Sequence, residues 1–139
     1  MTHYDLAIIG SGSGNSLIGP DFADWQIAII EESTFGGTCL NVGCIPTKMY
    51  VYPADIAESI KEAGRLGIDG GVDRVRWVDI RDRVFGRIDP ISASGRDYRD
   101  HGTPNTTLYE AHAEFTGPGE LVLSTGETIT ADRIVLATG

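Results

Sequence analysis

The chain has 139 residues, enough for one domain core and too few for two. Twenty acidic residues against eleven basic ones give a formal net charge of -9, which argues against binding to nucleic acids, because their phosphate backbone requires a basic face. No apolar run approaches the roughly 20 residues of a membrane helix, and residues 1–5 lack the features of a signal peptide. We therefore expect a cytoplasmic protein with no nucleic-acid or membrane partner.

The first third of the chain is predicted to form a β-turn-α-β unit. Residues 4–9 are an apolar run typical of a buried strand, and the glycine-rich residues 10–14 follow at once. A short helix over residues 15–24, weakened by Gly19-Pro20, leads to a second apolar strand over residues 26–30. Strands joined through such a crossover should lie parallel in one sheet.

The middle of the chain is predicted to be helical. A loop over residues 32–39 should lead into a long helix that begins near Cys44 or Pro46, bends at Pro53 and ends near residue 63. Residues 77–100 are also predicted to be largely helical, although two glycines and a proline interrupt them.

The last third of the chain predicts a small antiparallel meander. Its strands should cover residues 108–115, 121–124 and 128–130, and a final buried strand should cover residues 133–137. The fold class is therefore α/β, with a Rossmann-like βαβ unit, a parallel sheet and a small antiparallel meander. Because a sheet strand followed directly by Thr138-Gly139 looks cut, we expect a fragment of a larger multi-domain fold.

The first turn carries a dinucleotide-binding fingerprint. Gly10 and Gly12 occupy its first two glycine positions, where glycine permits a tight turn and a close approach of the backbone to a pyrophosphate. The amides and the dipole of the following helix should favour that anion. Asn15 holds the third position in place of glycine or alanine, so the helix should pack differently on its strand.

An acidic residue follows the second strand. Glu31 lies 21 positions after Gly10, and a carboxylate at about this distance from the turn binds a ribose hydroxyl. This favours FAD or NAD over NADP, and the turn alone does not choose between the first two. A solvated strand end without a ligand is the alternative.

Cys39 and Cys44 lie five positions apart at the predicted start of the long helix. A helix start favours the reactive thiolate, and Gly43 frees the backbone to bring the two sulfur atoms together. Three alternatives remain: half of a zinc site, two buried free thiols, or a structural disulfide. The three histidines are too scattered to complete a zinc site, so no metal is expected.

Residues 36–48 carry the most specific pattern in the chain, Gly-Gly-Thr-Cys-Leu-Asn-Val-Gly-Cys-Ile-Pro-Thr-Lys. This run resembles the active-site signature of the class I pyridine nucleotide-disulfide oxidoreductases. Residues 111–113 resemble the family's segment whose backbone contacts the adenine of FAD, and residues 134–139 resemble its strand that returns to the flavin. The resemblance therefore covers the whole chain.

The resemblance implies an enzyme in which a nicotinamide reduces FAD and FAD reduces a disulfide between Cys39 and Cys44. Cys44 would lie next to the flavin, Cys39 would attack the substrate disulfide, and Lys48 would lie near the flavin ring. The cofactor-binding residues that the resemblance implies are Gly10, Gly12, Ser13, Gly14, Glu31, Glu32, Gly37, Thr38, Cys39, Gly43, Cys44, Lys48, His112, Ala113, Ala137, Thr138 and Gly139.

The resemblance also implies a place in a longer protein. Residues 1–139 would be the N-terminal part of the FAD-binding domain, and the NADPH-binding and dimerisation domains would lie outside them. The intact protein would be a homodimer, and these residues alone would not turn over substrate. The alternative is a stand-alone FAD-binding module without activity.

The substrate is indicated by three segments, residues 10–16, 47–52 and 83–90. They resemble the branch of the family that uses NADPH to reduce mycothione, the disulfide of mycothiol. The alternative is that these segments are helix surfaces and packed aromatic residues, which leaves dihydrolipoamide dehydrogenase or a glutathione reductase-like enzyme open.

Overall fold

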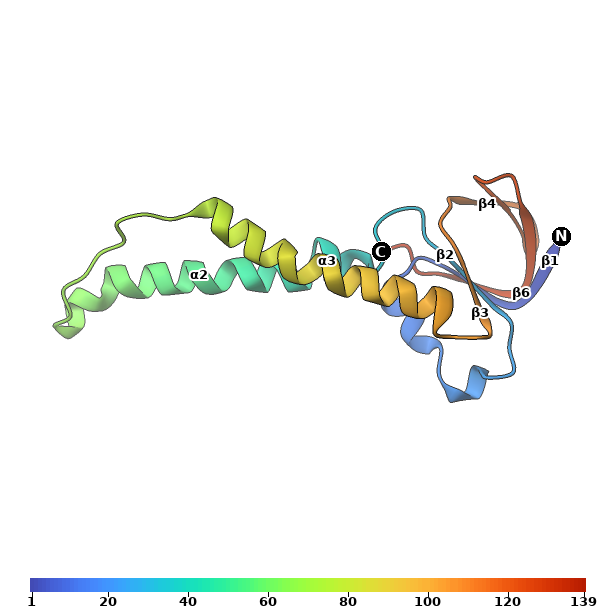
Figure 1. Cartoon of the computed structure of the whole chain (residues 1–139), viewed down its shortest axis with the longest axis horizontal. Helices are drawn as coiled ribbons and strands as arrows, with labels where there is room; N and C mark the ends of the chain where they lie inside the picture. Colours follow the sequence, from blue (N-terminus) through green and yellow to red (C-terminus); the bar gives the residue numbers. More distant parts are fainter.

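The computed structural model describes residues 1–139, in which two long helices project from one edge of a six-stranded sheet (Figure 1). The sheet has the strand order β3-β2-β1-β6-β5-β4. Its strands are β1 (Thr2–Ile9), β2 (Ile27–Ile30), β3 (Thr106–Tyr109), β4 (Ala113–Gly117), β5 (Glu120–Leu123) and β6 (Thr128–Leu136). The α/β class, with a parallel sheet and an antiparallel meander, is confirmed.

The four strands β3, β2, β1 and β6 run parallel, and β5 and β4 continue the sheet antiparallel. The predicted strands over residues 128–130 and 133–137 are one strand, β6. Its first three residues pair with β5, and it pairs with β1 along nearly its whole length. The second half was predicted to be buried, but Arg133 and Leu136 are exposed.

The predicted strand over residues 108–115 is wrong in its extent and its partners. Residues 106–109 form β3, which pairs with β2 in the parallel part of the sheet. The chain then turns at the buried Ala111, and the antiparallel meander begins with β4. The turn is held at Glu31, whose N–H donates to the Tyr109 carbonyl and whose carbonyl accepts from the Ala111 N–H. An alternating pattern predicts a strand but does not say which neighbour it pairs with.

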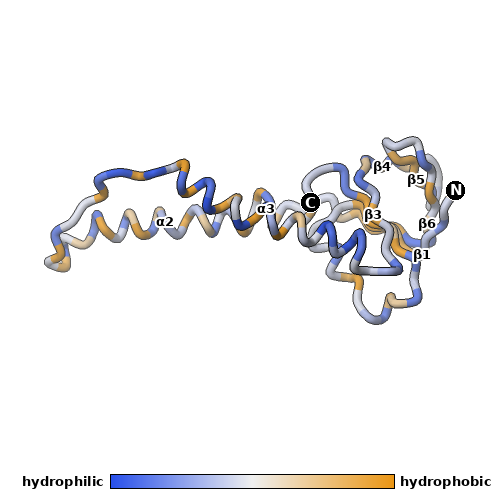
Figure 2. The backbone as a smooth tube through the Cα atoms, viewed as in Figure 1, coloured by the Kyte–Doolittle hydropathy of each residue, from blue (hydrophilic) through white to orange (hydrophobic).

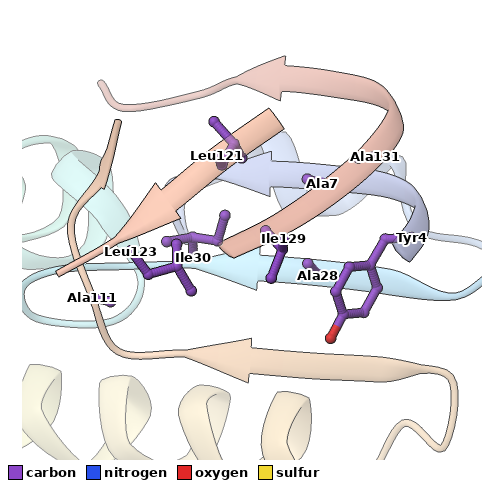
Figure 3. Close-up of a cluster of buried hydrophobic side chains, with 9 residues drawn as sticks. All are labelled: Tyr4, Ala7, Ala28, Ile30, Ala111, Leu121, Leu123, Ile129 and Ala131. Atoms are coloured by element: carbon purple, nitrogen blue, oxygen red, sulfur yellow. The ribbon is translucent and has the colours of Figure 1, made fainter. Parts of the chain in front are cut away.

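Apolar side chains pack on both faces of the parallel strands, because successive residues of a strand point to opposite faces. Leu6, Ile8, Ile27 and Ile29 form one cluster. The other cluster fills the space between the parallel strands and the meander, as Figure 3 shows, and includes Tyr4, Ala7, Ala28, Ile30, Ala111, Leu121, Leu123, Ile129 and Ala131. This second cluster packs the meander against β1 and β2.

Two short 3-10 helices replace the helix that was predicted over residues 15–24. They are η1 (Ser13–Leu17) and η2 (Pro20–Phe22). Gly19, which directly precedes Pro20, has an extended backbone. A residue that precedes proline is disfavoured in the helical conformation, which explains the break. The first helix after the glycine-rich turn therefore has only five residues.

Asn15 occupies the third fingerprint position because its side chain closes the turn. The residue is buried, and its Nδ2 donates to the Gly10 carbonyl at 2.8 Å. Gly14 supplies the close packing instead, since a methyl group there would collide with the Ala137 side chain.

We expect Asn15→Ala to destabilise the protein by about 1–3 kcal/mol, because the buried Gly10 carbonyl would lose its donor. Urea unfolding measures this change in the free energy of unfolding. Ser16→Ala is the matched control, since the Ser16 hydroxyl is exposed and bonds only the carbonyl three residues earlier. Equal effects of the two substitutions would contradict the role of Asn15.

Two long antiparallel helices, α2 (Cys44–Glu62) and α3 (Trp77–His101), form the projecting hairpin, and a one-turn helix, α1 (Gly37–Asn41), precedes them. α2 continues through Pro53, which cannot donate to the Met49 carbonyl four residues earlier. Arg83 of α3 supplies that donor at 3.3 Å. Apolar and polar residues alternate along the hairpin, whereas the sheet strands are more uniformly apolar (Figure 2).

α3 is one continuous helix, so the interruptions predicted at Gly86, Pro90 and Gly95 are wrong. Its buried residues Val84, Ile88 and Ser92 recur every fourth position and give it one packed face, which overrides the low helix propensity of glycine. Gly95 also has a packing role, because a methyl group there would lie 3.3 Å from the Phe35 ring. None of the helices is both long and apolar enough to cross a membrane.

Candidate functional site: a glycine-lined cavity with a cysteine pair

The candidate site lies where β1, β2 and β6 end, beside the start of α2. Ligands of open parallel sheets bind at this edge, outside the carboxyl ends of the strands. A cavity of about 420 Å³ is lined there by Ser11, Gly12, Ser13, Gly14, Glu31, Gly37, Thr38, Cys39, Gly43, Cys44, Ala137, Thr138 and Gly139. The fingerprint turn, the acidic residue and both cysteines thus line the same cavity.

Close backbone contacts build this cavity, which explains its glycines. A methyl group on Gly10 would collide with the Ala137 carbonyl, and one on Gly37 would lie 2.5 Å from the Cα of Gly12. Gly10, Gly36 and Gly37 also have positive φ angles of 109°, 110° and 72°, which side chains rarely tolerate.

The turn presents backbone amides to the cavity. The N–H groups of Gly12, Ser13 and Gly14 donate to no acceptor within the chain. Because η1 has only five residues, the helix dipole that the sequence predicted contributes little, and the amides of the turn itself are the groups that could hold an anion.

Glu31 is held at the rim of the cavity by two serines. Its Oε2 accepts from the N–H and the hydroxyl of Ser11, at 3.0 and 2.6 Å, and its Oε1 accepts from the N–H and the hydroxyl of Ser33, at 2.9 and 3.0 Å. Partial burial acts to raise the pKa of Glu31, but the hydrogen bonds from Ser11 and Ser33 together hold this pKa below its ordinary value. The group is therefore a carboxylate at neutral pH.

A second cavity, of about 230 Å³, continues on the other side of Glu31 toward the meander. The two cavities share Glu31 and Thr138. The lining of the second one includes Ile9, Gly10, Ile30, Glu31, Glu32, Ser33, Ala111, His112, Ala113, Phe115, Leu136 and Thr138. An elongated ligand with a ribose at Glu31 would therefore have one half in each cavity.

His112 lies at the rim of the second cavity. Its Nδ1 is 3.0 Å from Oε2 of Glu32, and both groups are exposed. The His112 backbone is already occupied, because its N–H donates to the Ser124 hydroxyl and its carbonyl accepts from the Ser124 N–H. A backbone contact to a ligand in this cavity would thus come from a neighbour such as Ala113.

The two cysteines are free, exposed thiols on consecutive helices. Cys39 lies in α1, and Cys44 begins α2 after Gly43, where a methyl group would lie 2.9 Å from the Thr38 carbonyl. The glycine thus allows α1 and α2 to meet and brings the two thiols together. A hydrogen bond to Cys44 raises the pKa of Cys39, because it stabilises the protonated thiol.

This pKa has a testable consequence for Cys39 in the reduced protein. We expect its alkylation by iodoacetamide to increase with pH through a midpoint above that of an ordinary cysteine, and the midpoint to fall in Cys44→Ala. Mass spectrometry of the alkylated peptide across a pH series measures both midpoints. The same shift stabilises the fold below the ordinary thiol pKa, and this contribution disappears as the pH rises through the raised value. An unchanged midpoint in Cys44→Ala would contradict the thiol pair.

Every predicted site residue except Lys48 lines one of the two cavities. Lys48 lies one helical turn beyond Cys44 and is exposed. Two serines that contact Glu31, Ser11 and Ser33, were not predicted. Their only signal in the sequence is their position: Ser11 lies beside a fingerprint glycine, and Ser33 lies two residues after Glu31.

The family model of the pyridine nucleotide-disulphide oxidoreductases matches residues 4–139. The chain belongs to this family. Its fold is therefore the Rossmann-like FAD-binding fragment of a flavoprotein reductase.

The chain is similar to curated members of this family from several bacteria. Mycothione reductase of Mycobacterium tuberculosis is 54% identical over 100% of this chain and 31% of its own length. Dihydrolipoyl dehydrogenase of Corynebacterium glutamicum is 31% identical over 99% of this chain, and glutathione reductase of Burkholderia cepacia is 28% identical over 98%. The chain thus spans about a third of the length of each of these relatives.

A solved structure shares the fold. The flavoprotein disulfide reductase RclA of Escherichia coli, in its Cu(II) complex, matches with a TM-score of 0.74 and 25% identity. The match covers 96% of this chain and 27% of the RclA chain.

Proposed function

We propose that the chain is the FAD-binding and dithiol part of a disulfide reductase that takes electrons from NADPH. The observation that supports this most directly is that Cys39 and Cys44 line the same cavity as the glycine turn and Glu31. A dithiol beside a dinucleotide site allows electrons to pass between cofactor and sulfur without a further carrier.

The residues of both cavities fit FAD. The free amides of Gly12, Ser13 and Gly14 would hold the pyrophosphate, and the Glu31 carboxylate would accept from a ribose hydroxyl. The adenine would enter the cavity beside Ala113, and the flavin would lie beside Thr38 and the cysteines. Bound FAD would supply the two-electron reduction that converts the Cys39–Cys44 disulfide to the dithiol.

The dithiol chemistry follows from the two sulfur atoms. The Cys39 thiolate attacks one sulfur of the substrate disulfide, a mixed disulfide forms, and the first substrate thiolate leaves and takes up a proton. The Cys44 thiolate then attacks the Cys39 sulfur, which releases the second substrate thiol and forms the Cys39–Cys44 disulfide. The substrate gains two electrons and two protons, and the enzyme loses them.

The proposed substrate is mycothione. The identity of 54% to a mycothione reductase, against 31% and 28% for the other two relatives, favours it over lipoamide and glutathione disulfide. We further propose that residues 1–139 are the N-terminal part of the FAD-binding domain of a cytoplasmic homodimer and that NADPH binds outside these residues. The coverage of 31% of the relative's length supports this assignment.

The test is oxidation of NADPH and NADH by the intact gene product, with mycothione, glutathione disulfide and lipoamide offered in turn. Turnover with NADPH and mycothione alone is expected. Turnover with NADH and lipoamide would support the roles of the flavin and the cysteines but would show that the protein is a dihydrolipoamide dehydrogenase and that mycothione is not its substrate. A protein without bound FAD and without turnover would overturn the proposal.

A further inference from the structure

Ser11 is a buried hydroxyl inside the phosphate-binding turn, at a variable position of the fingerprint. Its Oγ donates to Oε2 of Glu31 at 2.6 Å and accepts from the Gly36 N–H at 2.9 Å. The hydroxyl thus connects three segments that are distant in sequence: the turn, the end of β2, and the residue before α1.

The contact with Gly36 matters for the position of the dithiol. Gly36 has the left-handed φ angle of 110° and directly precedes α1, which carries Cys39. The carbonyls of the two residues before it, Thr34 and Phe35, both accept hydrogen bonds from the Asn41 side chain. The Phe35 carbonyl also accepts one from the Ser92 hydroxyl. The Ser11 hydroxyl holds the amide of the same loop against the turn.

The contact with Glu31 limits how a ribose can bind. A carboxylate has about four lone-pair positions, and Ser11 and Ser33 donate four hydrogen bonds to this one. A ribose hydroxyl must therefore replace one donor. The Ser33 hydroxyl is exposed and can turn to water, whereas the Ser11 hydroxyl is buried and also binds Gly36.

We propose that Ser11 is a positioning residue that acts on both halves of the site. It holds the Glu31 carboxylate for the adenosine ribose and holds the loop before α1, the helix that carries Cys39, while the ribose hydroxyl takes the place of the Ser33 hydroxyl. The ribose part rests on the proposed function, and the part that concerns the loop and Cys39 does not.

The experiment compares Ser11→Ala, Ser11→Thr and Ser33→Ala with the unchanged intact protein. Equilibrium titration with FAD gives the dissociation constant. Differential alkylation and mass spectrometry, after equilibration in glutathione buffers of graded ratio, give the equilibrium between the Cys39–Cys44 disulfide and the dithiol. The second readout reports on the geometry of the loop and requires no turnover.

Ser11→Ala is expected to weaken FAD binding about tenfold, the loss typical of one hydrogen bond to a charged group. It should also shift the thiol equilibrium about threefold or more toward the dithiol, because a loosened loop lowers the effective concentration of one thiol at the other. Ser33→Ala should change both values less than Ser11→Ala does, since the ribose hydroxyl takes the place of the Ser33 hydroxyl and the Ser33 N–H still donates to Glu31. Ser11→Thr keeps the hydroxyl and should restore both values.

Equal values for Ser11→Ala and Ser33→Ala in a protein that binds FAD would overturn the inference and leave the proposed function intact. If the unchanged protein binds no FAD, the proposed function fails, and an unshifted thiol equilibrium in Ser11→Ala would then overturn the inference as well. Ser11→Gly removes the same hydroxyl without placing a methyl group in the turn, so it replaces Ser11→Ala if that variant does not fold.

Discussion

Cys39→Ser and Cys44→Ser should each lower the rate of disulfide reduction roughly 10³-fold or more, while FAD stays bound. The reason is that serine lacks the thiolate that attacks or resolves the mixed disulfide. Steady-state oxidation of NADPH with mycothione measures the loss, and flavin absorbance after gel filtration measures FAD retention. Turnover near that of the unchanged protein in either variant would exclude the dithiol mechanism.

The two variants differ in a single turnover, which tests the separate roles of the sulfur atoms. In reduced Cys44→Ser, Cys39 can still attack once, so one equivalent of substrate thiol is released and a mixed disulfide at Cys39 is detectable by mass spectrometry. In Cys39→Ser no such adduct at residue 39 can form, and release of thiol should be much slower. The opposite pattern would exchange the roles of Cys39 and Cys44.

The sequence predicts the parts of the fold that depend on local patterns. β1, β2 and the long helix from Cys44 follow from apolar runs and from a proline in the first helical turn. The prediction of one helix over residues 15–24 was wrong, because Gly19-Pro20 breaks the helix and the Asn15 side chain bonds back to the turn. The place of β3 beside β2 depends on pairing over almost 80 residues, which no local pattern encodes.

The same distinction applies to the site. The spacing of Gly10, Glu31 and the cysteine pair identifies residues that the sheet brings together at one edge. The contacts that hold them were not predictable, because Ser11 reaches Glu31 and Gly36 only after the two strands pair. Lys48 was predicted from a pattern that gives residue type but not side-chain direction, and its side chain is exposed and lines neither cavity.

The backbone contact between Gly12 and Gly37 carries the second large prediction. A methyl group on Gly37 would lie 2.5 Å from the Gly12 Cα and 3.0 Å from its nitrogen, at a residue whose φ angle is +72°. Both atoms belong to the main chain and cannot rotate away. The phosphate-binding turn and the start of α1, which carries Cys39, would therefore have to separate.

We expect Gly37→Ala to destabilise the protein by about 2–4 kcal/mol, from backbone strain and overpacking together, and to weaken FAD binding because the amides of the turn shift. Urea unfolding and equilibrium FAD titration measure the two effects. Gly64→Ala is the matched control, since Gly64 lies in η3 (Ala63–Leu66) with no atom within 4 Å of the added methyl group. That substitution should be neutral or stabilise the protein by up to about 1 kcal/mol. Similar results for both glycines would mean that the turn and α1 are not in contact, and the shared cavity for cofactor and dithiol would lose its structural basis.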